Sequence, residues 1–260
     1  NLLGRFLTAW QMARMMRLHG ARYSVWKMLS ITLRTLFYGF FLPGELAFAG
    51  IRWYLISRID GLRAQTFASM TYVRLVQINL LLGIGLVTVM IDWPFSSLTF
   101  LPMCWILFSM LIGATVLLHT RLSSVVRSWI AENPLYERLP QWGKRRLDNL
   151  LSAFSSFRAL SLGDTIGIWG AGLMFKLSVA GSFWLISRSL GLDTSFLTLL
   201  WLSSVVELIQ LLPISVAGLG PREASMMYIL GLYGVTASAS VSFSLIIFVL
   251  RILVSLLGGV

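Results

Sequence analysis

Long apolar stretches separated by short polar connectors are the dominant pattern in the sequence. An α-helix needs about 20 mainly apolar residues to cross roughly 30 Å of hydrocarbon, so runs of that length are typical of membrane-spanning helices. A shorter helix is predicted over residues 3–17, where the last turn carries Arg14 and Arg17. The runs that are long enough predict spans over residues 73–91, 97–119, 165–187 and 237–257.

Two other apolar stretches are interrupted by helix-breaking residues. Residues 24–57 contain Leu42-Pro43-Gly44, and residues 195–234 contain Leu212-Pro213 followed by a glycine-rich segment. Proline lacks a backbone N–H and clashes with the preceding turn, so a helix does not run smoothly through it. The pieces on either side of each break are too short to span comfortably. We therefore predict two re-entrant hairpins, which a bilayer tolerates only where protein or a water-filled cavity satisfies the freed backbone groups.

The distribution of Lys and Arg orients these segments, because cationic loops are retained on the cytoplasmic side of the membrane. The Arg-rich stretches, which we expect to face the cytoplasm, are residues 14–27, 58–63 and 120–163. The connectors without Lys or Arg, which we expect to face outward, are residues 92–96, 189–195 and 234–236. The hairpin 24–57 would then enter and leave from the cytoplasm, and the hairpin 195–234 from outside.

The polar interval 120–163 has apolar residues at helical spacing, which predicts two amphipathic helices at the membrane surface. Its cations are Arg121, Arg127, Arg138, Lys144, Arg145, Arg146 and Arg158. A solvated surface that faces the membrane accounts for this pattern, and docking of a partner enzyme is the alternative.

Composition agrees with a membrane protein. The chain has 260 residues, of which 57% are hydrophobic and 12% charged, and its mean hydropathy is +0.81. A soluble domain has about 45–50% apolar and about 25% charged residues. The fold class predicted is therefore all-α: one polytopic helix bundle over residues 1–260, multi-pass in the inner (cytoplasmic) membrane. Its first half is 1–119, its connector is 120–163 and its second half is 164–260.

The net charge of +11 would suggest nucleic acid in a soluble protein. In a membrane protein it fits cytoplasmic loops beside anionic headgroups, so we expect no nucleic-acid partner. The single cysteine, Cys104, excludes an intrachain disulfide and a cysteine-based metal site.

The two breaks resemble each other. Residues 42–52 and 212–222 align without gaps and share the spacing P-x6-G-x-R. Interrupted hydrophobic segments at corresponding positions of two halves are the best sequence indication of a transporter's midplane site. Since the cation count gives the two copies opposed orientations, we predict an inverted repeat.

A helix that restarts after a break presents unpaired N–H groups and a positive dipole end, where anions bind readily. A nearby Arg adds a forked donor suited to phosphate, and a nearby Glu can neutralise it when no ligand is bound. The predicted helix breaks are Pro43, Gly44, Pro213 and Pro221. The predicted headgroup-binding residues are Arg222, Glu223, Arg52, Glu45, Gly218 and Gly220.

These charges also have a structural interpretation, in which Arg222 and Glu223 merely hold the hairpin together. Ionisable groups at membrane depth cost roughly 2.5–3.5 kcal/mol each on insertion scales, which favours a functional role. Residues that could line the same cavity are Glu207, Gln210, Lys176 and Arg74. The alternative is a bond to neighbouring helices for the first three and headgroup anchoring for Arg74, which lies near the cytoplasmic end of its span.

At these positions the chain resembles the membrane domain of the lysylphosphatidylglycerol synthase family, found in the multiple peptide resistance factor and in stand-alone bacterial and archaeal proteins. The stretches that carry the resemblance are 42–52, 72–75 and, most specifically, 213–224, which is close to P-x-S-x-G-G-L-G-x-R-E-A. Ala217 replaces a frequent glycine, and Tyr72 replaces the Asp that usually precedes Arg74. The resemblance implies a domain that flips aminoacylated phosphatidylglycerol, while a separate soluble domain makes it.

Three functions are compatible with these observations. The leading hypothesis is a flippase or transporter that moves a phospholipid or a polyprenyl-linked lipid between leaflets. The alternatives are the membrane part of an enzyme acting on lipid-linked substrates, by glycosyl or aminoacyl transfer, and a scaffold for such an enzyme. We expect no catalytic residues, metal or cofactor. The candidate partners are membrane lipids, a fused or cytoplasmic lipid-modifying enzyme, and further copies of the chain in a homo-oligomer.

Overall fold

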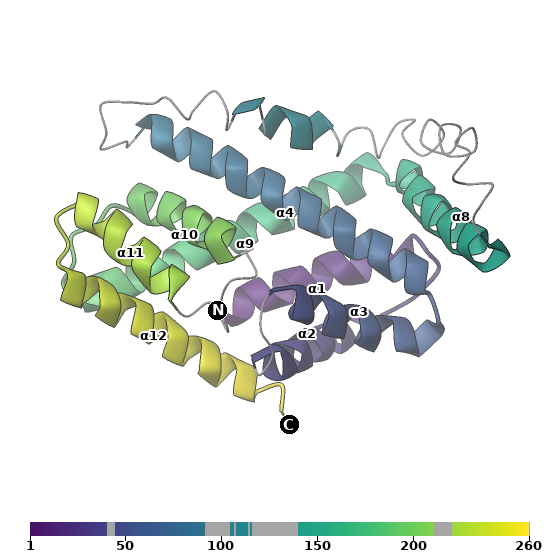
Figure 1. The fold of residues 1–260 in the computed structure, drawn as a ribbon, viewed down its shortest axis with the longest axis horizontal. Coiled ribbons are helices and arrows are strands. Elements are labelled where there is room, and N and C mark those ends of the chain that lie inside the picture. The colour runs from purple at the N-terminus through teal and green to yellow at the C-terminus, as the bar shows by residue number, and fades with distance from the viewer. Residues whose placement is uncertain are drawn as a thin grey trace.

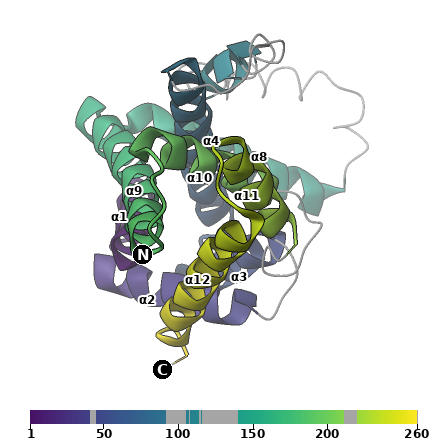
Figure 2. The ribbon, with the colours of Figure 1, turned by 90° about the vertical axis from the view of Figure 1, so that its left-hand side faces the viewer.

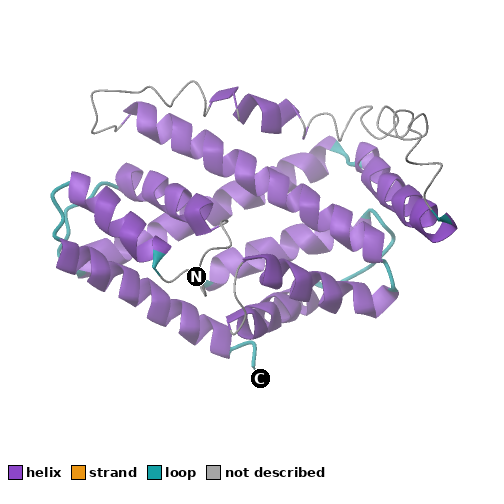
Figure 3. Cartoon of the chain, in the orientation of Figure 1, coloured by secondary structure: helices purple, strands orange, loops and turns teal. Residues whose placement is uncertain are grey.

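The computed structural model describes residues 1–40, 45–91, 105–106, 108–113, 115, 140–210 and 220–259, and within them the secondary structure is helical throughout (Figures 1 and 3). The elements are α1 (Leu2–Arg17), α2 (Val25–Phe40), α3 (Glu45–Asp60), α4 (Arg63–Ile91), α8 (Gln141–Ser155), the 3₁₀ turn η1 (Ser156–Ala159), α9 (Leu162–Ser189), α10 (Phe196–Gln210), α11 (Pro221–Leu232) and α12 (Ala237–Leu256). The described residues between 105 and 115 are helical as well. The predicted all-α class is confirmed.

Among the described residues, three helices are long and apolar enough to cross a membrane, namely α4, α9 and α12. They have 29, 28 and 20 residues, and at 1.5 Å per residue the shortest is about 30 Å long. They match three of the predicted spans, and the fourth, 97–119, lies mostly outside the described residues. The helices α2, α3, α10 and α11 have 16, 16, 15 and 12 residues, so each is at most about 24 Å long.

The helix α4 starts at Arg63 rather than at residue 73, where the apolar run begins. The turn before it is made by Gly61, whose φ of +69° is a conformation that glycine adopts without strain. The side chains of Thr66, Ala68 and Ser69 are completely buried. Tertiary packing therefore holds this first part of α4 in a helix although its residues are too polar to predict a span.

The helix α1 lies among α2, α4 and α9, and packs against all three. The short helices form two adjacent pairs, α2 with α3 and α10 with α11. Figure 1 shows the first pair on the right of the molecule and the second on the left. In the same view α4 runs from right to left along the chain, and α12 runs from left to right. Figure 2 shows α12 crossing in front of the bundle toward α2, which it contacts.

Three apolar clusters hold the helices together. One joins the four helices α9, α10, α11 and α12 around Phe183, Trp201 and Phe243. A second joins α1, α2 and α3, and a third joins α1, α4, α8 and α9. Tyr72, one of the two residues that depart from the family pattern, is fully buried in the third cluster, and the centre of its ring lies 5.0 Å from that of Phe157.

The connector between the halves agrees in part with the prediction. Of the two amphipathic helices expected over 120–163, the second is α8, which packs against the first half of the bundle through α4. The prediction of the other helix concerns residues 120–139, which lie outside the described residues.

Candidate functional site

The predicted site residues divide into those that the structure describes and those that it does not. Pro43, Gly44, Pro213 and Gly218 lie outside the described residues. Glu45, Gln210 and Pro221 belong to described helices, but their side chains are not described. The predictions that concern these side chains therefore stay predictions.

The start of α11 follows from three residues in sequence. Gly220 has φ +89°, a left-handed conformation that disfavours other residues. Pro221 occupies the first helical position, where its missing N–H costs nothing. The Glu223 carboxylate, at the third position, accepts a hydrogen bond from the Gly220 N–H through Oε2 at 2.6 Å. The predicted restart of a helix at this point is confirmed.

Arg222, the second residue of α11, is 1% exposed. Its Nη2 lies 2.7 Å from Oε1 of Glu223, and its Nε donates to Oγ of Ser244 on α12 at 3.2 Å. The guanidinium also lies 5.5 Å from the centre of the Phe248 ring. These four residues, Arg222, Glu223, Ser244 and Phe248, form what we call the Arg222 cluster.

In the Arg222 cluster the charge of Arg222 is neutralised by Glu223, and both carboxylate oxygens of Glu223 accept hydrogen bonds. The Ser244 hydroxyl donates to Oε1 of Glu223 at 2.9 Å, so that oxygen accepts from both Arg222 and Ser244. The other carboxylate oxygen, Oε2, accepts the hydrogen bond from the Gly220 N–H. The expectation of free N–H groups at this helix start is therefore wrong for Gly220, because the protein supplies its own anion there. The structure shows the ion pair between Glu223 and Arg222, and the role of Glu223 in ligand binding stays a prediction.

A second buried ion pair joins α9 to α10. Lys176 is 3% exposed, and its Nζ bonds to the Glu207 carboxylate. Arg74 of α4 lies within electrostatic range of Lys176. The structure thus brings together three of the four residues predicted to line a cavity or to link helices, and the Lys176–Glu207 bond is a link between helices.

Arg52, on α3, has surroundings unlike those of Arg222. Its Nη2 donates to the backbone carbonyl of Thr8 on α1 at 3.4 Å, and Arg5 lies within electrostatic range. Its Nε is buried without a hydrogen-bond partner in the described part of the chain.

Sequence reasoning missed Ser244 and Phe248. They lie one helical turn apart on α12, so both face the same neighbour. A hydroxyl group inside an apolar span needs a hydrogen-bond partner, so the position of Ser244 within the span indicates that it bonds to a polar group of a neighbouring helix. The sequence offered no signal for which of the α12 serines meets Arg222.

Comparison with known proteins decides the family. Residues 1–259 match the family described as lysylphosphatidylglycerol synthase TM region. The chain belongs to this family. No curated protein and no solved structure matches it significantly. Membership in the lysylphosphatidylglycerol synthase TM family indicates a lipid-related membrane protein, in agreement with the three long apolar helices.

Proposed function

We propose that the chain moves a phospholipid of the aminoacyl-phosphatidylglycerol kind, or a polyprenyl-linked lipid, between the leaflets of the cytoplasmic membrane. Arg222 holds the anionic part of the headgroup during this movement. The observation that carries the proposal is the Arg222 cluster: a guanidinium that is almost completely buried beside a long apolar helix and that, within the described residues, is balanced by its own neighbour in sequence.

A phosphate can take over the hydrogen bonds that Arg222 now donates to Glu223 and Ser244. Two phosphate oxygens would accept from Nε and Nη2 in the forked geometry that guanidinium groups favour. They would take the places of Glu223 Oε1 and Ser244 Oγ. Glu223 would retain the Gly220 N–H through Oε2. The cluster would then alternate between a closed state held by Glu223 and a loaded state held by the headgroup.

The packing of the helices supports an inverted repeat around this site. Exchanging α1 with α9, α2 with α10, α3 with α11 and α4 with α12 turns most of the observed helix contacts into other observed contacts. For example, α1 packs on α2 as α9 packs on α10, and α4 reaches α10 as α12 reaches α2. Together with the shared P-x6-G-x-R spacing, this pattern favours two opposed halves that rock about a site between them.

The opposed halves also give roles to the other predicted residues. Arg52 would serve the first half as Arg222 serves the second, with Glu45 as its carboxylate partner. Gly218, close to the helix start in sequence, would let the headgroup approach the backbone. The lipid path would be lined by the ion pair of Lys176 and Glu207, whose charges cancel. Gln210, one turn further along α10, would line it as well.

The test compares Arg222→Ala with Arg222→Ala/Glu223→Ala in liposomes that carry a headgroup-labelled lipid. Removing one partner of a buried pair costs about 3–5 kcal/mol because the other charge is left unpaired. The single variant is therefore expected to lose thermal stability as well as transport. The double variant strands no carboxylate, so we expect it to regain most of that stability and still move no lipid.

Transport by the double variant at the wild-type rate would contradict the proposal and assign Arg222 a structural role. A matched control is Arg188→Ala/Asp193→Ala, which removes an exposed ion pair at the end of α9. This control is expected to keep both stability and transport, because exposed pairs contribute only about 0–1 kcal/mol.

A further inference from the structure

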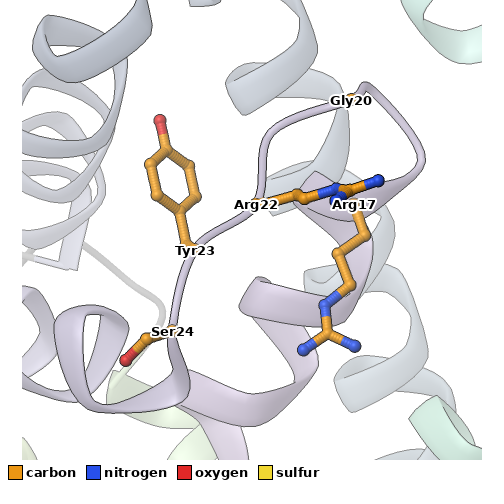
Figure 4. A pocket seen from close by; sticks show the side chains of 5 residues that line it. All are labelled: Arg17, Gly20, Arg22, Tyr23 and Ser24. Atoms are coloured by element: carbon orange, nitrogen blue, oxygen red, sulfur yellow. The ribbon is translucent and has the colours of Figure 1, made fainter.

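The turn between α1 and α2 contains two adjoining hollows of about 490 and 530 Å³. Both are lined by Gly20, Arg22 and Tyr23. Arg17 and Ser24 complete the first, and the second adds His19, Ala21, Lys27, Asp60 and Leu62. Figure 4 shows Arg17 and Arg22 on one side of the turn, with the Tyr23 ring on the other. We call these hollows the turn pocket.

The turn pocket has a fixed backbone. Gly20 takes φ +80°, and its N–H bonds to the Arg17 carbonyl at 3.0 Å. The Ala21 N–H reaches back to the Met16 carbonyl at 3.2 Å, which closes the end of α1. Ala21 and Tyr23 are each 5% exposed. The residue between them, Arg22, is therefore held at the surface by anchored neighbours.

The charged side chains that line the turn pocket are three cations, Arg17, Arg22 and Lys27, and one carboxylate, Asp60. Within the described chain, neither the Arg17 nor the Arg22 guanidinium has a hydrogen-bond or ion-pair partner, and both residues are exposed. Lys27 lies 5.3 Å from the centre of the Tyr23 ring. The carboxylate that lines the pocket, Asp60, accepts the Tyr23 hydroxyl proton in a hydrogen bond. Burial, and then this bond, raise the pKa of Tyr23, so the phenol stays neutral and adds no negative charge.

An exposed aromatic residue follows the pocket residues Tyr23 and Ser24 in the sequence. Trp26, in the first turn of α2, is 71% exposed, and its ring meets Phe6 of α1 at 5.9 Å between centroids. Exposed Trp residues are typical of the membrane–water interface, where headgroups lie. The pocket also belongs to the cation-rich stretch that the sequence places on the cytoplasmic side, where anionic lipids attract Lys and Arg.

We propose that the turn pocket is a binding site for a phosphate group, held by Arg17 and Arg22 with Lys27 as a further cation. The site is separate from the Arg222 cluster and does not depend on lipid transport. The phosphate belongs either to the headgroup of an anionic lipid that stays on the cytoplasmic surface or to a soluble phosphate compound. Both sources offer the same oxygens to two guanidinium groups that have no partner among the residues the structure describes.

The experiment uses the full chain in neutral detergent and counts bound molecules by native mass spectrometry, with phosphatidylglycerol in one arm and inorganic phosphate in the other. The test variant is Arg17→Gln/Arg22→Gln. The control, Arg58→Gln/Arg145→Gln, removes the same charge from exposed positions outside the pocket. The Arg222→Ala/Glu223→Ala variant empties the proposed transport site and leaves the turn pocket intact.

We expect the test variant to bind at least about tenfold more weakly, because hydrogen bonds to charged groups contribute enough for that ratio. The control and the Arg222→Ala/Glu223→Ala variant should keep the turn-pocket binding. Binding that is confined to the lipid arm identifies a lipid headgroup, and equal binding of inorganic phosphate identifies a soluble compound. Equal binding by the test variant and the wild type, or equal losses in the test and control variants, would overturn the proposal.

Discussion

Among the described residues, two charged side chains are buried, and each is matched within the protein. Arg222 is balanced by the residue that follows it, and Lys176 by Glu207 on the next helix. A lone charge inside a low-dielectric environment is costly, so each pair is expected to form whenever no other ion replaces its members.

The Lys176–Glu207 pair gives a direct prediction for stability. Lys176→Met leaves the Glu207 carboxylate without its partner, so the free energy of unfolding should fall by about 3–5 kcal/mol. Lys176→Met/Glu207→Met should recover most of this loss, since apolar side chains of similar volume often replace a buried pair at no cost. Thermal unfolding in detergent measures both. Equal loss in the single and double variants would mean that the pair is not coupled.

Sequence alone predicts which residues carry charge into the membrane but not which of them meet. Arg222 and Glu223 are adjacent, so their pairing was predictable from the chain. The bonds of Lys176 to Glu207 and of Arg222 to Ser244 depend on how α9 docks on α10 and α11 on α12. That docking is decided by the shapes of apolar side chains such as Phe183 and Phe243, which carry no periodic signal for it.

At the scale of the elements, hydrophobic runs predict most helices, and breaks predict where they are interrupted. The runs near 165–187 and 237–257 are α9 and α12, with bounds that differ by a few residues. The helix α4 begins earlier than the predicted span, because the apolar run marks only the part of the helix that is apolar enough to predict a span. The polar start of α4 is sustained by contacts with α1 and α3.

The contact of α9 with α1 and α4 depends on a glycine. A Cβ at Gly172 would lie 2.6 Å from Cδ1 of Leu80 and 3.2 Å from Nε2 of Gln11, whose amide donates to the Ile168 carbonyl at 2.7 Å. Gly172→Ala should therefore lower the free energy of unfolding by about 1–3 kcal/mol, the usual cost of overpacking.

The matched control for this substitution is Gly170→Ala, two residues earlier in the same helix. A Cβ there meets nothing within 4 Å, and Ala favours a helix over Gly by about 0.8–1.0 kcal/mol. Gly170→Ala should leave stability unchanged or raise it. If thermal unfolding shows the same shift for both variants, the close approach at Gly172 does not limit packing.

At the scale of the whole molecule, the proposed inverted repeat requires that the two polar ends of the bundle face opposite sides of the membrane. The cation count assigns α8 to the cytoplasm and the α9–α10 connector to the outside. In the structure these two segments flank α9, which is 28 residues long and could separate them across a bilayer.

Impermeant thiol labelling tests this topology in a Cys104→Ala background. The two positions are Ser152→Cys on α8 and Asp193→Cys on the α9–α10 connector, and both residues are exposed. In intact cells we expect labelling at position 193 and none at position 152 until the membrane is opened. The reverse pattern, or labelling of both from outside, would contradict the orientation.

The central claim is that this chain moves lipid between leaflets, and transbilayer movement in liposomes tests it most directly. Purified wild-type chain is reconstituted with a panel of headgroup-labelled lipids that includes aminoacylated phosphatidylglycerol, phosphatidylglycerol and a polyprenyl-linked lipid. We predict that at least one anionic or aminoacylated lipid exchanges leaflets faster than in protein-free liposomes and in liposomes with Arg222→Ala/Glu223→Ala. A folded wild-type chain that leaves every lipid at the protein-free rate would contradict the account and favour the membrane part of an enzyme or a scaffold.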